Sequence, residues 1–217
     1  MFCNLFLADE INRTSSKTQS ALLEAMEEGA VTVDSVTRKL PDPFIVLATQ
    51  NPSGSAGTQL LPESQLDRFM IRLSMGYPTV GEETEILKAK SSKKAAPQVE
   101  PIMTAQDLIE IRSAAEDVFV SDEIYDYIAR LSGATRSDRR LELGVSTRGS
   151  LAAAAMAKCA AMFKGRNFVI PEDVTFVYTD VCAHRIIPAR VKGKLPSDIE
   201  VREILCDICR GVTPPKI

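Results

Sequence analysis

The stretch from Asn4 to Arg13 reads N-L-F-L-A-D-E-I-N-R, and the interpretation of the whole chain starts from it. It belongs to a run that is apolar from Phe2 to Leu7 except for Asn4, and two adjacent carboxylates, Asp9 and Glu10, follow. This pattern predicts a buried strand that ends in acidic side chains, at the edge where open α/β sheets bind their ligands. A carboxylate there can hold Mg²⁺, and a second one can orient water beside a phosphate. A plain surface acid pair is the alternative.

Composition and charge exclude several classes of protein. The 217 residues are 45% hydrophobic and 25% charged, as in ordinary globular proteins of one or two small domains. No run of about 18 apolar residues occurs and no signal-peptide pattern opens the chain, so we expect no membrane insertion. The formal net charge of −3 argues against binding to nucleic acid. Five cysteines, an odd number, do not suggest a disulfide scaffold, and a cytoplasmic location follows by elimination.

Two features resemble reactive sites but have simpler explanations. Cys206 and Cys209 form a C-x-x-C pair, which can indicate metal or redox chemistry, yet the sequence holds no second pair and no nearby histidine. Their spacing beside Ile204 and Ile208 instead predicts buried or half-buried cysteines of a helix. The only histidine, His184, has no partner acid or cysteine nearby in the sequence, so we expect packing or helix capping from it.

Strand and helix signals alternate over roughly the first 78 residues, which predicts an α/β unit. A helix cap at Thr14 to Ser16 and a glycine at Gly29 bound the first helix, which we expect to end near Glu28. The other predicted elements are a hairpin of 31–33 and 36–40, a buried strand at 44–48, a loop from Pro52 to Gln59, a short helix at 63–69 and a third strand at 70–75.

The rest of the chain is predicted to be helical. Tyr77-Pro78 reads as a boundary, so the expected division is 1–78, a linker segment at 79–96 and a helical unit at 97–217. Thr104 and Asp107 predict a capping box at one helix start. The other predicted helix signals are a cap at Ser121, an alanine-rich helix at 147–164 and a start at Pro171.

Three more polar residues are candidates for the same chemistry. Asn51 follows the second buried strand, where its amide could approach a phosphate, although Asn-Pro is also an everyday turn. Arg68 lies in L-P-E-S-Q-L-D-R-F and could neutralise charge across a subunit interface; a local ion pair with Asp67 is the alternative. Arg148 opens the alanine-rich helix, where a cation is mildly unfavourable unless an anion lies nearby. A surface arginine is the plain alternative for Arg148.

The order of these features resembles the AAA+ ATPases, and more narrowly the MoxR family. The stretches L-A-D-E-I-N-R, K-T-Q-S-A-L-L-E-A-M-E-E, V-L-A-T-Q-N-P and L-P-E-S-Q-L-D-R-F carry the resemblance, which is densest from Leu5 to Pro78. It implies that ATP and Mg²⁺ are the cofactors. It also implies a parallel sheet and a helical lid, in which the hairpin at 31–40 is a lever toward partners or substrate.

The resemblance assigns a role to each candidate residue. Asp9 and Glu10 would be the Walker B pair, with Asp9 on Mg²⁺ through water and Glu10 on the attacking water. Asn51 would be sensor 1 and read the γ-phosphate. Arg68 would be the arginine finger that acts on a neighbouring subunit's nucleotide. Arg148 would be sensor 2 in the lid, acting on its own site or a neighbour's, although Thr147 stands where the family often has proline.

The glycine-rich phosphate loop G-x-x-x-x-G-K-[ST] does not occur in the 217 residues. By resemblance the sheet order is 5-1-4-3-2 and the chain starts at the third strand, so we expect a partial AAA+ core with unpaired strand edges, followed by an all-α lid. The amides that should hold the phosphates are missing as well. We therefore expect this chain alone to bind ATP poorly and to hydrolyse it negligibly.

Two functions from different classes follow from the resemblance. The first is part of a ring ATPase, with six subunits expected, that remodels or activates a protein partner such as a von Willebrand A domain protein, in a chaperone-like, assembly or metal-insertion role. The second is a non-enzymatic interaction module, a truncated subunit that docks on full-length rings. The charge and the lack of a basic or aromatic patch argue against a DNA-translocating motor.

Overall fold

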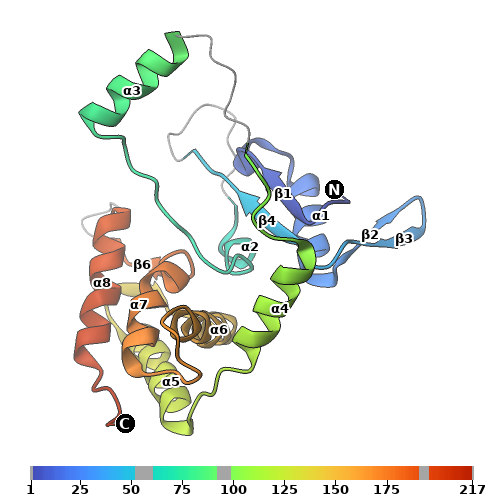
Figure 1. Cartoon of the computed structure of the whole chain (residues 1–217). Coiled ribbons are helices and arrows are strands. Elements are labelled where there is room, and N and C mark those ends of the chain that lie inside the picture. The colour runs from blue at the N-terminus through green and yellow to red at the C-terminus, as the bar shows by residue number, and fades with distance from the viewer. Residues whose placement is uncertain (1, 52–60, 92–98, 191–195, 217) are drawn as a thin grey trace.

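The computed structural model describes residues 2–51, 61–91, 99–190 and 196–216 (Figure 1). The predicted loop from Pro52 to Gln59 lies outside these residues. The N-terminal elements are β1 (Leu5–Ala8), the 3₁₀ helix η1 (Ile11–Arg13), α1 (Ser16–Glu28), β2 (Ala30–Val33), β3 (Val36–Lys39), β4 (Ile45–Ala48), α2 (Glu63–Leu66) and α3 (Val80–Ser91). The C-terminal elements are α4 (Ala105–Glu116), α5 (Asp122–Ser137), β5 (Leu141–Leu143), α6 (Thr147–Phe163), α7 (Pro171–Cys182), β6 (Ile187–Pro188) and α8 (Asp198–Gly211).

Strands β1 and β4 form a parallel pair in which Leu5 faces Ile45 and Ala8 faces Ala48. Within the described residues no third strand joins this sheet, as predicted for a parallel sheet that lacks its first strands. One face packs on a small core that includes Ile11, Leu22, Leu23 and Leu61. The side chains of Leu5, Leu7, Ile45 and Leu47 on the other face are exposed. Parallel sheets normally bury both faces, so this face is an uncovered apolar surface.

Helix α1 and the hairpin after it have the local chemistry that the sequence predicts. Ser15 caps the helix by accepting a hydrogen bond from the amide of Thr18, and Gly29 ends it in the left-handed region at φ 60°. Strands β2 and β3 pair antiparallel around Asp34 and Ser35, whose φ angles of 51° and 60° are those of a tight hairpin turn. The hairpin projects away from the rest of the molecule in Figure 1.

The strand predicted at residues 70–75 is wrong. The segment is irregular, and the amide of Arg72 donates to the carbonyl of Asp180 in α7 at 3.0 Å. The Arg72 guanidinium is also ion-paired with Asp198 at the start of α8. A strand needs a neighbouring strand edge for its backbone hydrogen bonds, and here a lid helix takes that place instead. The segment therefore connects the α/β part to the lid.

The lid has the larger core of the two parts. Helix α6 packs closely on α7 because it presents alanines, of which Ala153, Ala157 and Ala161 are completely buried. Val174, Tyr178 and Leu205 complete the same hydrophobic cluster from α7 and α8. Thr104 and Asp107 form the expected capping box and α7 starts at Pro171, whereas Ser121 stands at the N-cap position of α5 without a capping hydrogen bond from its side chain. An addition to the expected all-helical lid is the short antiparallel pair β5–β6.

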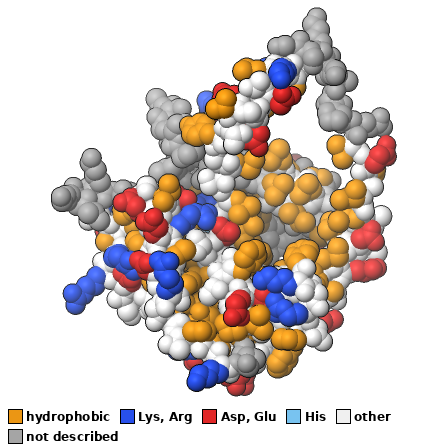
Figure 2. Space-filling model, turned by 60° about the vertical axis from the view of Figure 1, so that its left-hand side comes forward, with side chains coloured by type: hydrophobic (Ala, Val, Ile, Leu, Met, Phe, Trp, Pro, Cys, Tyr) orange, Lys and Arg blue, Asp and Glu red, His pale blue; other side chains and the backbone are white. Residues whose placement is uncertain are grey.

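Helix α3 stands apart from both parts, as Figure 1 shows. Its described side chains are exposed, including those of Ile86 and Leu87, and so are Met75 and Tyr77 before it. On the face drawn in Figure 2, hydrophobic side chains gather near the centre and charged side chains surround them.

None of the helices in the described parts of the chain is long and apolar enough to cross a membrane. An α/β core followed by a helical lid is thus confirmed, while the expected boundaries at 78 and 96 stay predictions.

Candidate functional site

The acid pair lies where parallel strands β1 and β4 end side by side. The hydroxyl of Thr49, the residue after β4, donates to Asp9 Oδ1 at 2.5 Å. The same hydroxyl accepts from the backbone amide of Glu10 at 2.8 Å. Glu10 is in the left-handed region at φ 47° and ψ 52°, a costly conformation for a residue other than glycine. Its carboxylate lies 2.9 Å from a guanidinium nitrogen of Arg13. Thr49 thus fixes both acids of the loop.

Asn51 is brought to the same edge of the sheet. The side-chain amide of Asn12 donates to the Asn51 carbonyl at 3.2 Å. Asn12 is almost fully buried, and its Oδ1 is a buried oxygen without a hydrogen-bond partner among the described residues. Gln19 Nε2 donates to the Ile11 carbonyl at 3.2 Å, so the start of α1 lies against the acid loop. The structure therefore assembles the two acids and Asn51 from two separate segments.

The oxygen ligands at this edge suit a Mg²⁺ ion that is bound jointly by the protein, water and a phosphate ligand. Asp9 and Glu10 offer carboxylate oxygens, the ligand type that this ion prefers. No group of three or more histidine, cysteine, aspartate or glutamate side chains in the described residues could form a complete metal cage. Mg²⁺ commonly uses one or two carboxylates and completes its shell with water and phosphate. The residues therefore fit an ion that arrives with a nucleotide.

Arg68 and Arg148 meet at a different place. Arg68 Nη1 lies 2.8 Å from one carboxylate oxygen of Glu27, and Arg148 Nη2 lies 2.6 Å from the other. Glu27 is in the last turn of α1, whereas Gln19, eight residues earlier, contacts the acid loop. Eight residues of α-helix span about 12 Å along the axis. The two arginines are thus brought together with each other, and the structure does not bring them to the acids of the same chain.

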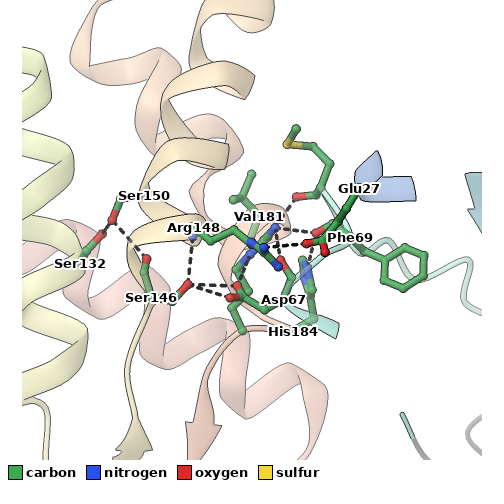
Figure 3. A network of polar contacts seen from close by, with 12 residues as sticks. Glu27, Asp67, Phe69, Ser132, Ser146, Arg148, Ser150, Val181 and His184 are labelled. Carbon is green, nitrogen blue, oxygen red and sulfur yellow. Dashed lines mark hydrogen bonds and ion pairs between the residues drawn. The ribbon is translucent and has the colours of Figure 1, made fainter. Parts of the chain in front are cut away.

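A second polar cluster, the Asp67–Arg185 junction, adjoins the pair of Arg68 and Arg148 (Figure 3). Arg185 follows α7, and its side chain is only 2% exposed. Its Nε donates to Asp67 Oδ1 at 3.0 Å. Asp67 also accepts from the hydroxyl of Ser146 at 2.9 Å, and Ser146 is the N-cap of the helix that carries Arg148. Asp67 therefore pairs with Arg185, and the alternative of a local Asp67–Arg68 pair is wrong.

His184 belongs to the same junction. Its Nε2 lies 2.9 Å from the carbonyl of Phe69, which can only accept, so Nε2 carries the proton of the neutral ring. Nδ1 is buried and has no partner among the described residues. Burial, together with the nearby charge of Arg185, lowers the pKa of His184 to about 4. The expected structural role of this histidine is confirmed.

The C-x-x-C pair does not form a reactive centre in this structure. Cys209 is half-buried, and burial raises the pKa of its thiol to about 12. Cys206 is exposed, which corrects the expectation that both cysteines are covered. The reason is that α8 packs through Val201, Ile204 and Ile208, and Cys206 lies off that face.

Sequence reasoning missed the residues that organise both sites. The sequence alone assigns no role to Thr49 or Glu27. Asp67 and Arg185 lie 118 positions apart, and Ser146 and Asp67 lie 79 apart. A single sequence carries no signal for such pairings, except that Arg148 at a helix start calls for a nearby anion.

Comparisons with known proteins agree with this architecture. Residues 1–71 match the profile of the ATPase family associated with various cellular activities (AAA), and residues 133–204 match an AAA lid domain. The uncharacterized protein YeaC of Bacillus subtilis is 44% identical over 205 residues, which cover 93% of this chain and 64% of YeaC. Chaperone MoxR1 of Mycobacterium tuberculosis is 40% identical over 193 residues, which cover 85% of this chain and 51% of MoxR1.

The fold has a counterpart among solved structures. A proposed ATPase from Cytophaga hutchinsonii superimposes with a TM-score of 0.87 at 37% identity, over 99% of this chain and 67% of that protein. The chain thus spans between about half and two thirds of the length of these curated relatives. Because sequence and structure agree along nearly all of its length, this chain belongs to the MoxR family of AAA+ ATPases.

Proposed function

We propose that this chain supplies the Walker B, sensor 1, arginine-finger and lid residues of an ATP-hydrolysing ring that remodels or activates a protein partner. The observation that supports it most is the convergence of Asp9, Glu10 and the Asn51 segment at the end of two parallel strands. Such an edge is where α/β sheets bind nucleotides. The relative named chaperone MoxR1 agrees with a role on proteins.

In this proposal Asp9 holds Mg²⁺ through water, and Glu10 orients the attacking water. Mg²⁺, when bound with ATP, would help to neutralise the charge that develops on the phosphate oxygens. Thr49 holds Asp9 in place, and Arg13 pairs with one oxygen of the Glu10 carboxylate, which leaves the second oxygen to accept a hydrogen bond from water. Asn51 contacts the γ-phosphate as sensor 1.

Arg68 and Arg148 act together on the nucleotide of a neighbouring subunit. Two observations support this: both bind Glu27, and Glu27 lies about 12 Å along α1 from the turn that touches their own acid loop. A guanidinium delivered in this way stabilises the charge of the transferring phosphoryl group. A hexameric ring, a von Willebrand A domain partner and a cytoplasmic location complete the proposal.

A non-enzymatic docking module is the second candidate. The observation that favours it is that Arg68 and Arg148 are both held on Glu27, away from the acid loop of their own chain. Such a chain would offer Arg68 and Arg148 to a neighbour's ATP while its own acids stay idle. The two candidates share the arginine pair and differ in whether Glu10 contributes.

The test adds the purified chain to a full-length MoxR-family ATPase that carries the phosphate loop and measures the ATP turnover of the mixture. The ring-subunit proposal expects a change in rate that Arg68→Ala and Glu10→Gln both abolish. The docking-module candidate expects the change to depend on Arg68 and to survive Glu10→Gln. Arg130→Ala, which removes an exposed arginine paired with Asp126, is the control. No change in rate with the wild-type chain contradicts both candidates.

A further inference from the structure

Arg185 is a costly residue to bury, and its contacts show what it holds. Besides the carboxylate of Asp67, its guanidinium binds three backbone carbonyls of the turn that follows α2. They are the carbonyls of Asp67 at 3.2 Å, Phe69 at 2.5 Å and Met70 at 3.0 Å. The other carbonyl it reaches is that of Val181, in α7. A planar fork of five donors suits this cluster of acceptors, whereas a lysine ammonium could not reach them together.

The residue enclosed by these contacts is Arg68. Arg185 binds the carbonyls of the residues on both sides of it, and the Nε of Arg68 is itself buried without a partner among the described residues. The direction in which the Arg68 side chain leaves the turn is therefore set by the lid, through Arg185.

The same junction sets the position of Arg148. The Ser146 hydroxyl donates to Asp67 and accepts from the amide of Gly149 at 3.1 Å, so the first turn of α6 is tied to the residue before Arg68. Asp67 thereby links the turn that carries Arg68 to the helix that carries Arg148. Glu27 then bridges the two guanidiniums on the outer side.

We propose that Arg185, acting through Asp67, is a positioning residue that fixes Arg68 and Arg148 as one unit on the lid. This inference rests on the proposed function for its catalytic consequence. Because the two arginines are fixed as one unit, a movement of the lid carries both of them at once toward or away from a neighbour's nucleotide. Neither Arg185 nor Asp67 touches the nucleotide in this arrangement.

The first arm of the experiment uses the chain by itself. Arg185→Lys keeps the charge and loses the fork. Hydrogen exchange should rise at residues 66–73 and 146–150, which contain the amides of Phe69, Arg72 and Gly149. The control is Arg166→Lys, because Arg166 binds the buried Asp173 through two nitrogens at 2.6 and 2.7 Å wholly within the lid. The control should raise exchange around 166–173 only. Unchanged exchange at 66–73 in Arg185→Lys overturns the inference.

The second arm uses the mixture with a phosphate-loop-bearing ATPase. We expect Arg185→Lys to lower kcat to the level of Arg68→Ala, at least tenfold below the wild-type mixture, with KM for ATP and co-assembly unchanged. Arg166→Lys should keep kcat, which separates positioning from mere loss of lid stability. Wild-type kcat with Arg185→Lys overturns the inference. If Arg185→Lys does not fold, Asp67→Asn takes its place with the same expected loss.

The two proposals fail in distinguishable ways. A wild-type mixture without any Arg68-dependent turnover overturns the proposed function, and the exchange arm then decides by itself whether Arg185 fixes the arginine pair.

Discussion

Arg148 and Glu27 lie 121 positions apart in the sequence, yet a guanidinium nitrogen of the first lies 2.6 Å from a carboxylate oxygen of the second. The other oxygen of Glu27 holds Arg68. One carboxylate thus pairs with both of the arginines that the proposed function assigns to a phosphate. A phosphate ligand has to compete with Glu27 for them.

Glu27→Gln should make the arginine pair a better anion site. The variant keeps the shape of the side chain and removes the competing charge, so we expect tighter binding of tripolyphosphate in calorimetry at low salt. Because the ion pairs are partly exposed, the free energy of unfolding should fall by less than about 2 kcal/mol. Glu24→Gln, at an exposed position of the same helix, is the control. Equal affinities for wild type and Glu27→Gln would contradict the prediction.

Arg185→Leu should lower stability far more in the whole chain than in the isolated lid. In the whole chain it leaves Asp67 and several carbonyls unpaired, so we expect a loss of about 2–4 kcal/mol in urea unfolding. In the isolated lid, residues 97–217, those partners are gone, Arg185 keeps only the Val181 carbonyl, and water replaces the acceptors of residues 67–70. There Arg185→Leu should change the stability by less than about 1 kcal/mol. An equal loss in both contexts would exclude this account.

Thr49→Val should loosen the acid loop. The valine has the same shape but neither donates to Asp9 nor accepts from the amide of Glu10. We expect a loss of roughly 1 kcal/mol in the free energy of unfolding, since the site is exposed, and faster exchange of the Glu10 amide. Thr37→Val, which removes a hydroxyl contact within the β2–β3 hairpin, serves as the matched control and should leave the Glu10 amide unaffected.

His184 should make the chain acid-sensitive. Its pKa is lowered to about 4 in the folded protein, from an ordinary value near 6.5, chiefly by burial. Between these values the unfolded chain binds more protons than the folded chain. The contribution of His184 to the free energy of unfolding is therefore fully present above pH 6.5 and is lost as the pH falls toward 4. The free energy of unfolding should fall by at most about 3 kcal/mol over this range. His184→Gln should flatten the pH dependence of urea unfolding in this window, and an unchanged curve would refute the assignment.

The cysteines should differ in their reactivity toward iodoacetamide at pH 8. Cys3 and Cys206 are exposed and should be modified first. Cys182 is buried, and its pKa is raised to about 12 mainly by burial, so it should resist modification until the chain unfolds. Mass spectrometry of partly labelled protein gives the order directly. Early labelling of Cys182 would show that the lid core opens readily.

Local signals in the sequence predicted the local structure well. The Ser15 cap, the end of α1 at Gly29 and the capping box at Thr104 were all predicted, because each depends on residues a few positions apart. The strand expected at residues 70–75 failed because a strand depends on a partner edge, which lies elsewhere in the fold. The alternative of a local pair between Arg68 and Asp67 failed for the same reason. The real partner of Arg68, Glu27, comes from another helix.

The buried charge of Arg185 also bears on the order in which the protein is made. Ribosomes build chains from the N-terminus, so Asp67, Phe69 and Met70 emerge more than a hundred residues before Arg185 does. When the last lid helices form, the acceptors for this guanidinium are already present. A lid that closes without them lacks the carboxylate and the three carbonyls that this guanidinium binds. Completion of the lid core is therefore most favourable in a chain whose α/β part is already in place.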